Sequence, residues 1–314
     1  MKKLSQQFKP RLGLALSGGG ARGLAHIGAL KALEEAGIQP DYLAGASMGG
    51  VIAAAYAAGL KPDEIEQIAA DTSQTRNLLR LADLSLPRQG IFRGKRLLAF
   101  FEQHLQGRTF AELQIPLTLI AVDLNTGQEV RLQEGSVAQA LRATVSVPGL
   151  LAPVVQGGMR LVDGGLLNNL PVDVARQMGA DVVLGVDVDW QNDSSWQALA
   201  RLKPLSGTMG GLIATLGDSF EALIRQQRAY KLQNASPEFL VRPDIPAEVT
   251  ILTGYNRVAE LITQGEEATR PVLPELEEAL QPYRDWLFKG RSRQRRSFSR
   301  LSDRSSSVTV QPPG

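Results

Sequence analysis

The sequence contains no cysteine, and it has only two histidines, His26 and His104, among its 314 residues. The absence of cysteine excludes a disulfide scaffold, a cysteine nucleophile and a thiolate metal site, and it fits a reducing compartment. Two imidazoles without any thiol leave little from which to build a catalytic zinc site. We therefore expect no bound metal.

Long hydrophobic runs are also missing. No apolar stretch approaches the length of a transmembrane helix. Residues 1–10 are basic, but they lack the apolar core of a signal peptide. We expect a loose N-terminal arm over residues 1–10 and a cytoplasmic protein without a membrane anchor.

Charge is small overall but unevenly placed. The formal net charge is +2, and residues 289–304 carry a local charge of +6, which leaves −4 for the remainder. We expect residues 289–314 to form a disordered basic tail, since their apolar content is too low for folding. This tail either attracts anionic lipid at the inner face of the membrane or is a solvated segment without function. Nucleic acid is not expected as a partner, because the remainder is mildly acidic and aromatic residues make up only 5% of the chain.

Strand-like and helix-like patterns alternate along the chain, which predicts a three-layer α/β/α fold with a mostly parallel central sheet. We expect one domain over residues 11–288, with its motifs in residues 11–188 and a mainly helical part in residues 205–288. Residues 71–93 lack periodicity and form either a lid or an ordinary loop. The expected strands span residues 12–16, 42–45, 117–122, 128–132, 154–155, 159–162, 182–188 and 239–241. The expected helices span residues 24–36, 47–58, 62–70, 94–105, 137–145, 171–179, 208–233, 255–262 and 272–280.

A glycine-rich turn follows the first apolar run and opens the first helix. Glycines permit positive φ angles and close approach of a ligand, so backbone N–H groups can converge on an anion beside the positive end of a helix. The residues of this predicted anion-binding loop are Gly18, Gly19, Gly20, Ala21, Arg22 and Gly23.

A second turn, Gly45-Ala46-Ser47-Met48-Gly49, lies between a short apolar run and an alanine-rich helix. G-x-S-x-G between a strand and a helix is typical of a nucleophile elbow, in which the serine occupies a sharp turn and the glycines remove clashes. The alternative is a serine that caps a helix N-terminus.

The first loop also matches G-x-G-x-x-G, the pattern of dinucleotide-binding folds. That pattern needs an acidic residue at the end of the second strand to bind the ribose. Asp41 lies at the right distance along the chain but before the strand, and the strand ends at Ser47. A nucleotide-binding oxidoreductase therefore remains only as an alternative.

A serine hydroxyl needs a base to accept its proton. No histidine follows residue 104, so a Ser-His-Asp triad in α/β-hydrolase order is excluded. We expect His26 to be a packed or capping residue and His104 to be structural or exposed. Asp163 is the leading candidate base, because Gly164 and Gly165 follow it and allow close approach; Asp-Gly is also typical of a hairpin turn, and both interpretations stay open.

The order GGGARG, GASMG and DGG resembles the bacterial members of the patatin-like phospholipase family. The likeness includes Ala25-His26-Ile27-Gly28, Val147-Pro148-Gly149-Leu150 and Asn168-Asn169-Leu170-Pro171. It extends over residues 11–188. This resemblance implies a patatin-like fold without a cofactor and hydrolysis of the acyl esters of lipids.

By the same resemblance, Ser47 is the nucleophile and Asp163 the base of a Ser-Asp dyad, and the loop from Gly18 to Gly23 forms the oxyanion hole. Arg22 either orients a lipid phosphate or braces this loop through a salt bridge. A non-catalytic interaction protein on the same fold is a further alternative. Acyl length, head group and oligomeric state are not specified by these motifs.

Overall fold

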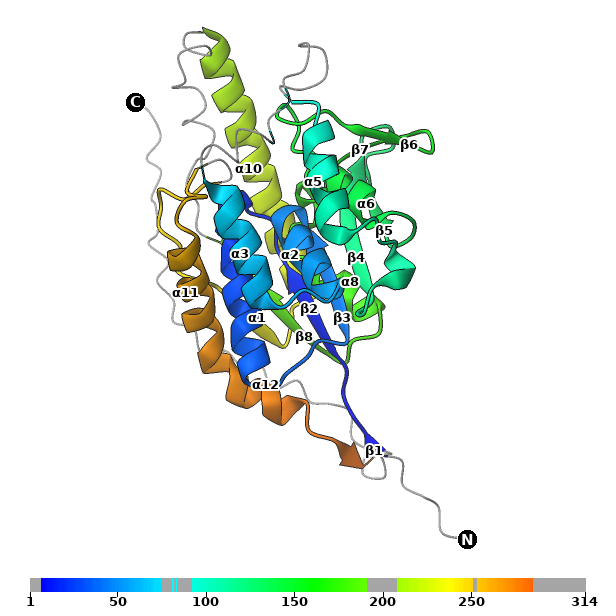
Figure 1. Ribbon diagram of the computed structural model, residues 1–314, viewed down its shortest axis with the longest axis vertical. Coiled ribbons are helices and arrows are strands. Elements are labelled where there is room, and N and C mark those ends of the chain that lie inside the picture. The colour runs from blue at the N-terminus through cyan, green and yellow to red at the C-terminus, as the bar shows by residue number, and fades with distance from the viewer. Residues whose placement is uncertain are drawn as a thin grey trace, which may run out of the picture. The chain divides into compact units, whose positions relative to one another are not determined.

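The computed structural model describes residues 7–74, 81, 83, 92–190, 208–250 and 253–284. An eight-stranded sheet lies at the centre of residues 9–281, with helices on both of its faces (Figure 1). The strand order is β6-β7-β4-β3-β2-β8-β9, and β5 pairs with β4. The pairs β4-β3, β3-β2, β2-β8 and β8-β9 are parallel, whereas β5, β6 and β7 join by antiparallel pairing. The expected three-layer α/β/α fold is confirmed.

The strands of this sheet are short, and three of them, β2, β4 and β8, are buried along their whole length. Their bounds are β2 (Leu12–Leu16), β3 (Tyr42–Ala46), β4 (Leu117–Asp123), β5 (Gln128–Leu132), β6 (Val154–Gln156), β7 (Met159–Asp163), β8 (Val182–Val186) and β9 (Phe239–Val241). The helices are α1 (Ala25–Glu35), α2 (Ser47–Ala57), α3 (Pro62–Ser73), α5 (Lys95–Leu105), α6 (Val137–Thr144), α7 (Gly165–Asn168), α8 (Val172–Gln177), α10 (Thr208–Asn234), α11 (Val258–Thr269) and α12 (Leu273–Ala279).

Alternate residues of the central strands face opposite helical layers. In β2, Leu14 and Leu16 belong to the larger apolar core, which includes residues of α1, α2, α5, α6 and α11, whereas Ala15 belongs to a second core with residues of α8. This period of two is the pleat of a strand. Both faces are apolar because helices cover both, which explains why these strands appear in the sequence as continuous apolar runs.

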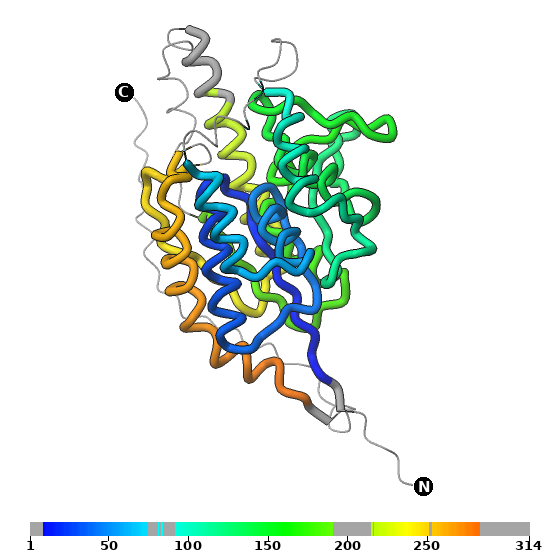
Figure 2. Tube along the Cα trace, in the orientation of Figure 1, coloured from blue at the N-terminus to red at the C-terminus, as the bar shows by residue number. Residues whose placement is uncertain are grey.

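Helices α1 and α11 are far apart in the sequence but lie side by side (Figure 2). Their close approach depends on two glycines: a Cβ on Gly28 would collide with the Ile262 carbonyl, and one on Gly265 with the Ala25 carbonyl. The C-terminal helices therefore pack directly against the helix that follows the first glycine loop.

Several boundaries differ from the sequence-based expectations. The helix expected over residues 255–262 begins later, at Val258, because a turn that contains Gly254 at φ +94° precedes it. The helix also continues further than expected, to Thr269. Most of the segment 71–93 and the tail 289–314 lie outside the described residues. In the N-terminal arm, β1 (Gln7–Phe8) pairs with β10 (Tyr283–Arg284), a short antiparallel pairing that we did not expect. Among the described residues, no helix combines the length and the hydropathy needed to cross a membrane.

Candidate active site

Ser47 lies at the sharp turn between β3 and α2. Its φ of 49° falls in the left-handed region, where a residue other than glycine is strained. The flanking glycines make this turn possible: a Cβ on Gly45 would lie 2.7 Å from the Gly50 backbone, and one on Gly49 would collide with the Leu16 carbonyl. Ser47 is partly exposed.

A threonine on α6 holds this turn in place. The Ser47 N–H donates to Thr144 Oγ1 at 3.0 Å, and the Thr144 hydroxyl donates to the Ile120 carbonyl of β4 at 2.5 Å. Thr144 is fully buried. The Thr144 hydroxyl therefore connects the strained Ser47 to the sheet, because it accepts one hydrogen bond and donates another.

Asp163 is brought to Ser47 by sheet topology. It is the last residue of β7, and its partner in register is Ala121 of β4, the strand next to β3. The Ser47 hydroxyl donates a hydrogen bond to the Asp163 carboxylate. The Gly165 N–H donates to the same carboxylate at 2.8 Å. Two side chains from distant parts of the sequence therefore meet, and the hairpin turn lies instead at Gly157 and Gly158, before β7.

The environment of Asp163 weakens its acidity. Only 6% of this residue is exposed. Burial raises the pKa of Asp163 to about 6, although the hydrogen bonds from Ser47 and from the Gly165 N–H act in the opposite direction. The group is therefore mostly ionised at pH 7 and is a stronger base than an ordinary aspartate.

The glycine loop runs beside the elbow. It contains a short 3₁₀ helix over Gly20–Leu24, and Gly19 and Gly20 have φ values of +158° and +59°. A Cβ on Gly18 would lie 3.1 Å from Ser47 Cβ, so this loop passes directly against the serine. The glycines therefore permit a backbone approach that larger residues would block.

Several amides of this loop are already engaged. The N–H groups of Gly18, Ala21 and Arg22 donate to the carbonyls of Asn169, Thr250 and Gly19. Those of Gly19 and Gly20 have no hydrogen-bond acceptor within the described part of the chain. Gly20 is also partly exposed.

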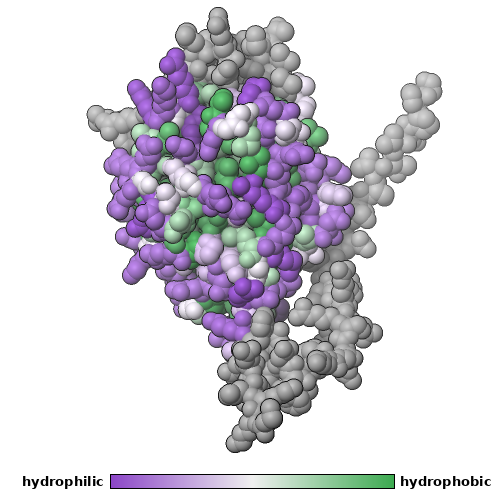
Figure 3. All heavy atoms as spheres, turned by 90° about the vertical axis from the view of Figure 1, so that its right-hand side faces the viewer, coloured by the Kyte–Doolittle hydropathy of each residue, from purple (hydrophilic) through white to green (hydrophobic). Residues whose placement is uncertain are grey.

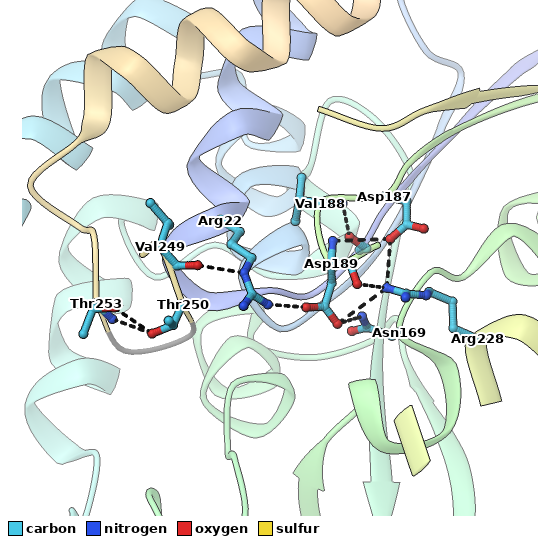
Figure 4. Close-up of polar contacts among 10 residues, drawn as sticks. Arg22, Asn169, Asp187, Val188, Asp189, Arg228, Val249, Thr250 and Thr253 are labelled. Carbon is cyan, nitrogen blue, oxygen red and sulfur yellow. Dashed lines mark hydrogen bonds and ion pairs between the residues drawn. The ribbon is translucent and has the colours of Figure 1, made fainter. Parts of the chain in front are cut away.

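A cluster of ion pairs and hydrogen bonds holds Arg22 of the glycine loop in place (Figure 4). The buried Arg22 donates from Nε to the Val249 carbonyl at 3.0 Å and pairs with Asp189 at 2.5 Å. Asp189 also accepts from Asn169, and Arg228 of α10 lies 3.6 Å from its carboxylate. Burial raises the pKa of Asp189, and the two guanidinium groups offset this only in part. Of the two expectations for Arg22, the structure contains the salt bridge.

The remaining polar candidates have structural contacts. His26 is fully buried, and its Nε2 lies 2.8 Å from the Ser17 carbonyl, just before the glycine loop. Burial lowers the pKa of His26 to about 4, so the ring is neutral at pH 7. His104 contacts the Phe100 carbonyl within α5. The Asp41 carboxylate accepts from the Leu12 N–H at the start of β2, at the opposite end of that strand from the glycine loop.

Two contributors to the site escaped the sequence analysis. Thr144 belongs to no motif recognised there, and nothing in the sequence indicates its contact with a serine 97 positions away. Asn169 stands in the Asn-Asn-Leu-Pro stretch that carries the resemblance, but only the structure shows that its carbonyl accepts from Gly18.

Comparisons with known proteins identify a family and a shared fold. The family model described as patatin-like phospholipase matches residues 14–176, which include the elbow, the glycine loop and Asp163. The uncharacterised NTE family protein Rv1063c of Mycobacterium tuberculosis is 39% identical over 180 residues, which are 57% of this chain and 49% of that protein. Human patatin-like phospholipase domain-containing protein 6 is 36% identical over 187 residues, which are 58% of this chain and 14% of that protein.

Among solved structures, VipD from Legionella pneumophila superposes with a TM-score of 0.54 over 90% of this chain and 70% of that one, at 15% identity. This likeness shows a shared fold. The alignments to the mycobacterial relatives span about half of those proteins. Since the family model matches more than half of the sequence, the chain belongs to the patatin-like phospholipase family.

Proposed function

We propose that this chain is a serine acyl hydrolase that cleaves fatty-acyl esters of phospholipids or lysophospholipids through an acyl-enzyme. Membership of a patatin-like phospholipase family supports a lipid hydrolase. One observation carries the finer proposal: a strained, partly exposed Ser47 donates its hydroxyl hydrogen bond to a buried carboxylate, that of Asp163. A nucleophile paired with a base is the arrangement that acyl transfer requires.

In the first half-reaction, Ser47 Oγ bonds to the ester carbonyl carbon while its proton passes to Asp163. The carbonyl oxygen becomes an oxyanion, the bond to the leaving alkoxide breaks, and Asp163 returns the proton to that alkoxide. In the second half-reaction, Asp163 accepts a proton from water, which attacks the acyl-enzyme. Collapse of this second intermediate releases the fatty acid and returns the proton to Ser47.

Backbone amides are the proposed oxyanion donors. The predicted donors were the residues from Gly18 to Gly23, and the hydrogen bonds of the loop favour Gly19 and Gly20, whose N–H groups have no acceptor within the described residues. These amides need no reorganisation when charge develops on the substrate. Loss of one such donor typically costs about 2.7–4 kcal/mol of transition-state stabilisation.

The pKa of Asp163 explains how a carboxylate can replace histidine. An exposed aspartate is a weaker base than imidazole by about two to three pKa units. With a pKa of about 6, Asp163 removes most of that difference. The proposed base is therefore matched to work near neutral pH.

Turnover of a soluble chromogenic acyl ester, measured with the parent chain, Ser47→Ala and Asp163→Asn, tests the proposal. We expect Ser47-dependent turnover that also falls sharply in Asp163→Asn, which keeps the shape of the side chain but removes its proton affinity. Near-normal turnover in Asp163→Asn would assign the base to another group. Complete inactivity of the parent chain, together with binding of NAD or NADP, would favour the oxidoreductase alternative.

A further inference from the structure

The β6–β7 hairpin presents an apolar side chain among cations. Its two strands join through Gly157 and Gly158, and Val155 is 73% exposed. In register, Val155 lies opposite Arg160 of β7, and directly opposite residues of an antiparallel pair share one face of the sheet. On the other side of Arg160, Leu124 donates its backbone N–H to the Arg160 carbonyl and is itself 43% exposed. Two exposed apolar residues therefore flank an exposed arginine.

A pocket of about 320 Å³ separates this hairpin from the N-terminal end of α5. Apolar groups of Leu98, Pro153 and Val154 line it, and the exposed Arg93 and Lys95 stand at its edge. No carboxylate is among its lining residues. The pocket therefore combines an apolar wall with a cationic edge.

Three cations of this region have no carboxylate partner in the part of the chain that the structure describes. Within the described residues, no ion pair involves Arg93, Lys95 or Arg160. Two nearby carboxylates, those of Asp83 and Asp123, accept hydrogen bonds from other groups. Asp83 accepts from the first backbone N–H groups of α5, and Asp123 accepts from Arg160 N, Asn125 N and the Thr126 hydroxyl. The side-chain N–H donors of Arg93, Lys95 and Arg160 are therefore not engaged by these carboxylates.

We propose that the surface around this pocket, formed by Arg93, Lys95 and Val155 with Arg160 beside Val155 and here called the hairpin face, binds the surface of an anionic phospholipid bilayer. Exposed apolar side chains can enter the headgroup region, while cations beside them attract anionic headgroups. Figure 3 views the side of the molecule toward which this hairpin points in Figure 1, and apolar surface lies there between hydrophilic side chains. None of these residues belongs to the basic segment of residues 289–314.

The hairpin face and the dyad share one supporting segment. Arg142 of α6 lines the pocket, donates to the carbonyls of Gly94 and Arg93, and donates to Ser146 Oγ at 2.5 Å. The Ser146 carbonyl in turn accepts from the Asp163 N–H at 3.0 Å. A bilayer on this face would therefore lie near the segment that positions the base. This inference rests on the proposed lipid substrate.

Vesicle sedimentation of the full-length chain tests the inference. The variants are Val155→Asp and the double variant Arg93→Gln/Lys95→Gln, and the vesicles are phosphatidylcholine with or without phosphatidylglycerol. Each cation near an anionic membrane contributes about a fivefold gain in affinity, so the double variant should bind mixed vesicles about 30-fold more weakly. Val155→Asp should also weaken binding, because it places a negative charge at the centre of the face.

Tyr230→Asp on α10 is the matched control, since Tyr230 is an exposed apolar residue, 62% exposed, on another element. It should bind as the parent chain does, and all variants should hydrolyse a soluble ester at the parent rate. Parent-like vesicle binding by both hairpin-face variants, or equal losses in the control, would overturn the inference. Failure of the proposed function would appear differently, as absent Ser47-dependent turnover of the soluble ester in the parent chain.

Discussion

Replacing Asp163 by asparagine should remove activity but increase the stability of the fold. Burial raises the pKa of Asp163 from 3.8 to about 6, so ionisation of this group opposes folding. A shift of this size corresponds to about 3 kcal/mol, at about 1.36 kcal/mol per pKa unit. Asparagine is neutral at every pH, can still accept from the Gly165 N–H and can donate to the Ser47 hydroxyl. It therefore avoids the cost of a buried charge without losing these contacts.

The pH dependence gives the sign of this effect. Below pH 3.8 the carboxyl is protonated in both the folded and the unfolded chain, so parent and variant should be about equally stable. As the pH rises toward 6, the unfolded chain releases this proton more readily, and the parent loses stability relative to Asp163→Asn. Above that window the variant should be more stable by up to about 3 kcal/mol. Urea unfolding at a series of pH values from 4 to 8 measures the difference, with 4 and 8 as approximate end points on either side of the titration.

Asp173→Asn provides a control of opposite sign. Burial raises the pKa of Asp173, but hydrogen bonds from Lys231 and Asn168 outweigh this effect and lower the pKa overall. The charge of Asp173 therefore stabilises the fold. This variant should be less stable than the parent near pH 8, with a difference that shrinks as the pH falls. If Asp163→Asn is instead destabilised to the same extent at every pH, the carboxyl does not carry a raised pKa, and the argument for a strengthened base fails.

Further predictions concern the supports of the site. Thr144→Val should leave the Ser47 N–H and a sheet carbonyl unpaired, at about 1–3 kcal/mol each, and should lower kcat more than it changes KM, while Thr144→Ser restores activity. Parent-like kcat in Thr144→Val would remove this role. Gly28→Ala should cost about 3 kcal/mol in a urea melt, because its Cβ would collide with the Ile262 carbonyl. Arg22→Gln should slow ester turnover by relaxing the glycine loop; if it weakens only binding of phosphate-containing lipids, Arg22 is a substrate contact instead.

The sequence predicted most of the sheet because local patterns determine it. The runs at residues 12–16 and 117–122 are mostly apolar on both faces, as expected for buried strands, and Gly157-Gly158 between two short strands predicted the hairpin. The sharp turn at Ser47 was equally visible, since glycines at fixed positions around this residue reflect steric needs of the turn itself. The assignment of Asp163 depended on resemblance, because its own residues also fitted a hairpin turn.

Contacts between distant residues were not predictable in the same way. The ion pair of Arg22 with Asp189 joins residues 167 positions apart. In the sequence, neither residue can be distinguished from an ordinary charged residue at the surface. The sequence likewise could not show which loop amides remain free, since the acceptors for Gly18 and Ala21 come from Asn169 and Thr250. Such contacts can be identified only when the strand order of the sheet is known, because this order determines which loops lie next to one another.

Reaction with a fluorophosphonate, followed by peptide mass spectrometry, tests the central claim most directly. A serine activated by a neighbouring carboxylate should form a covalent adduct, and the account predicts that this adduct is on Ser47. The adduct should be absent from Ser47→Ala and should form much more slowly in Asp163→Asn. An adduct on a different serine, or an equal rate of labelling in Asp163→Asn, would contradict the proposed dyad.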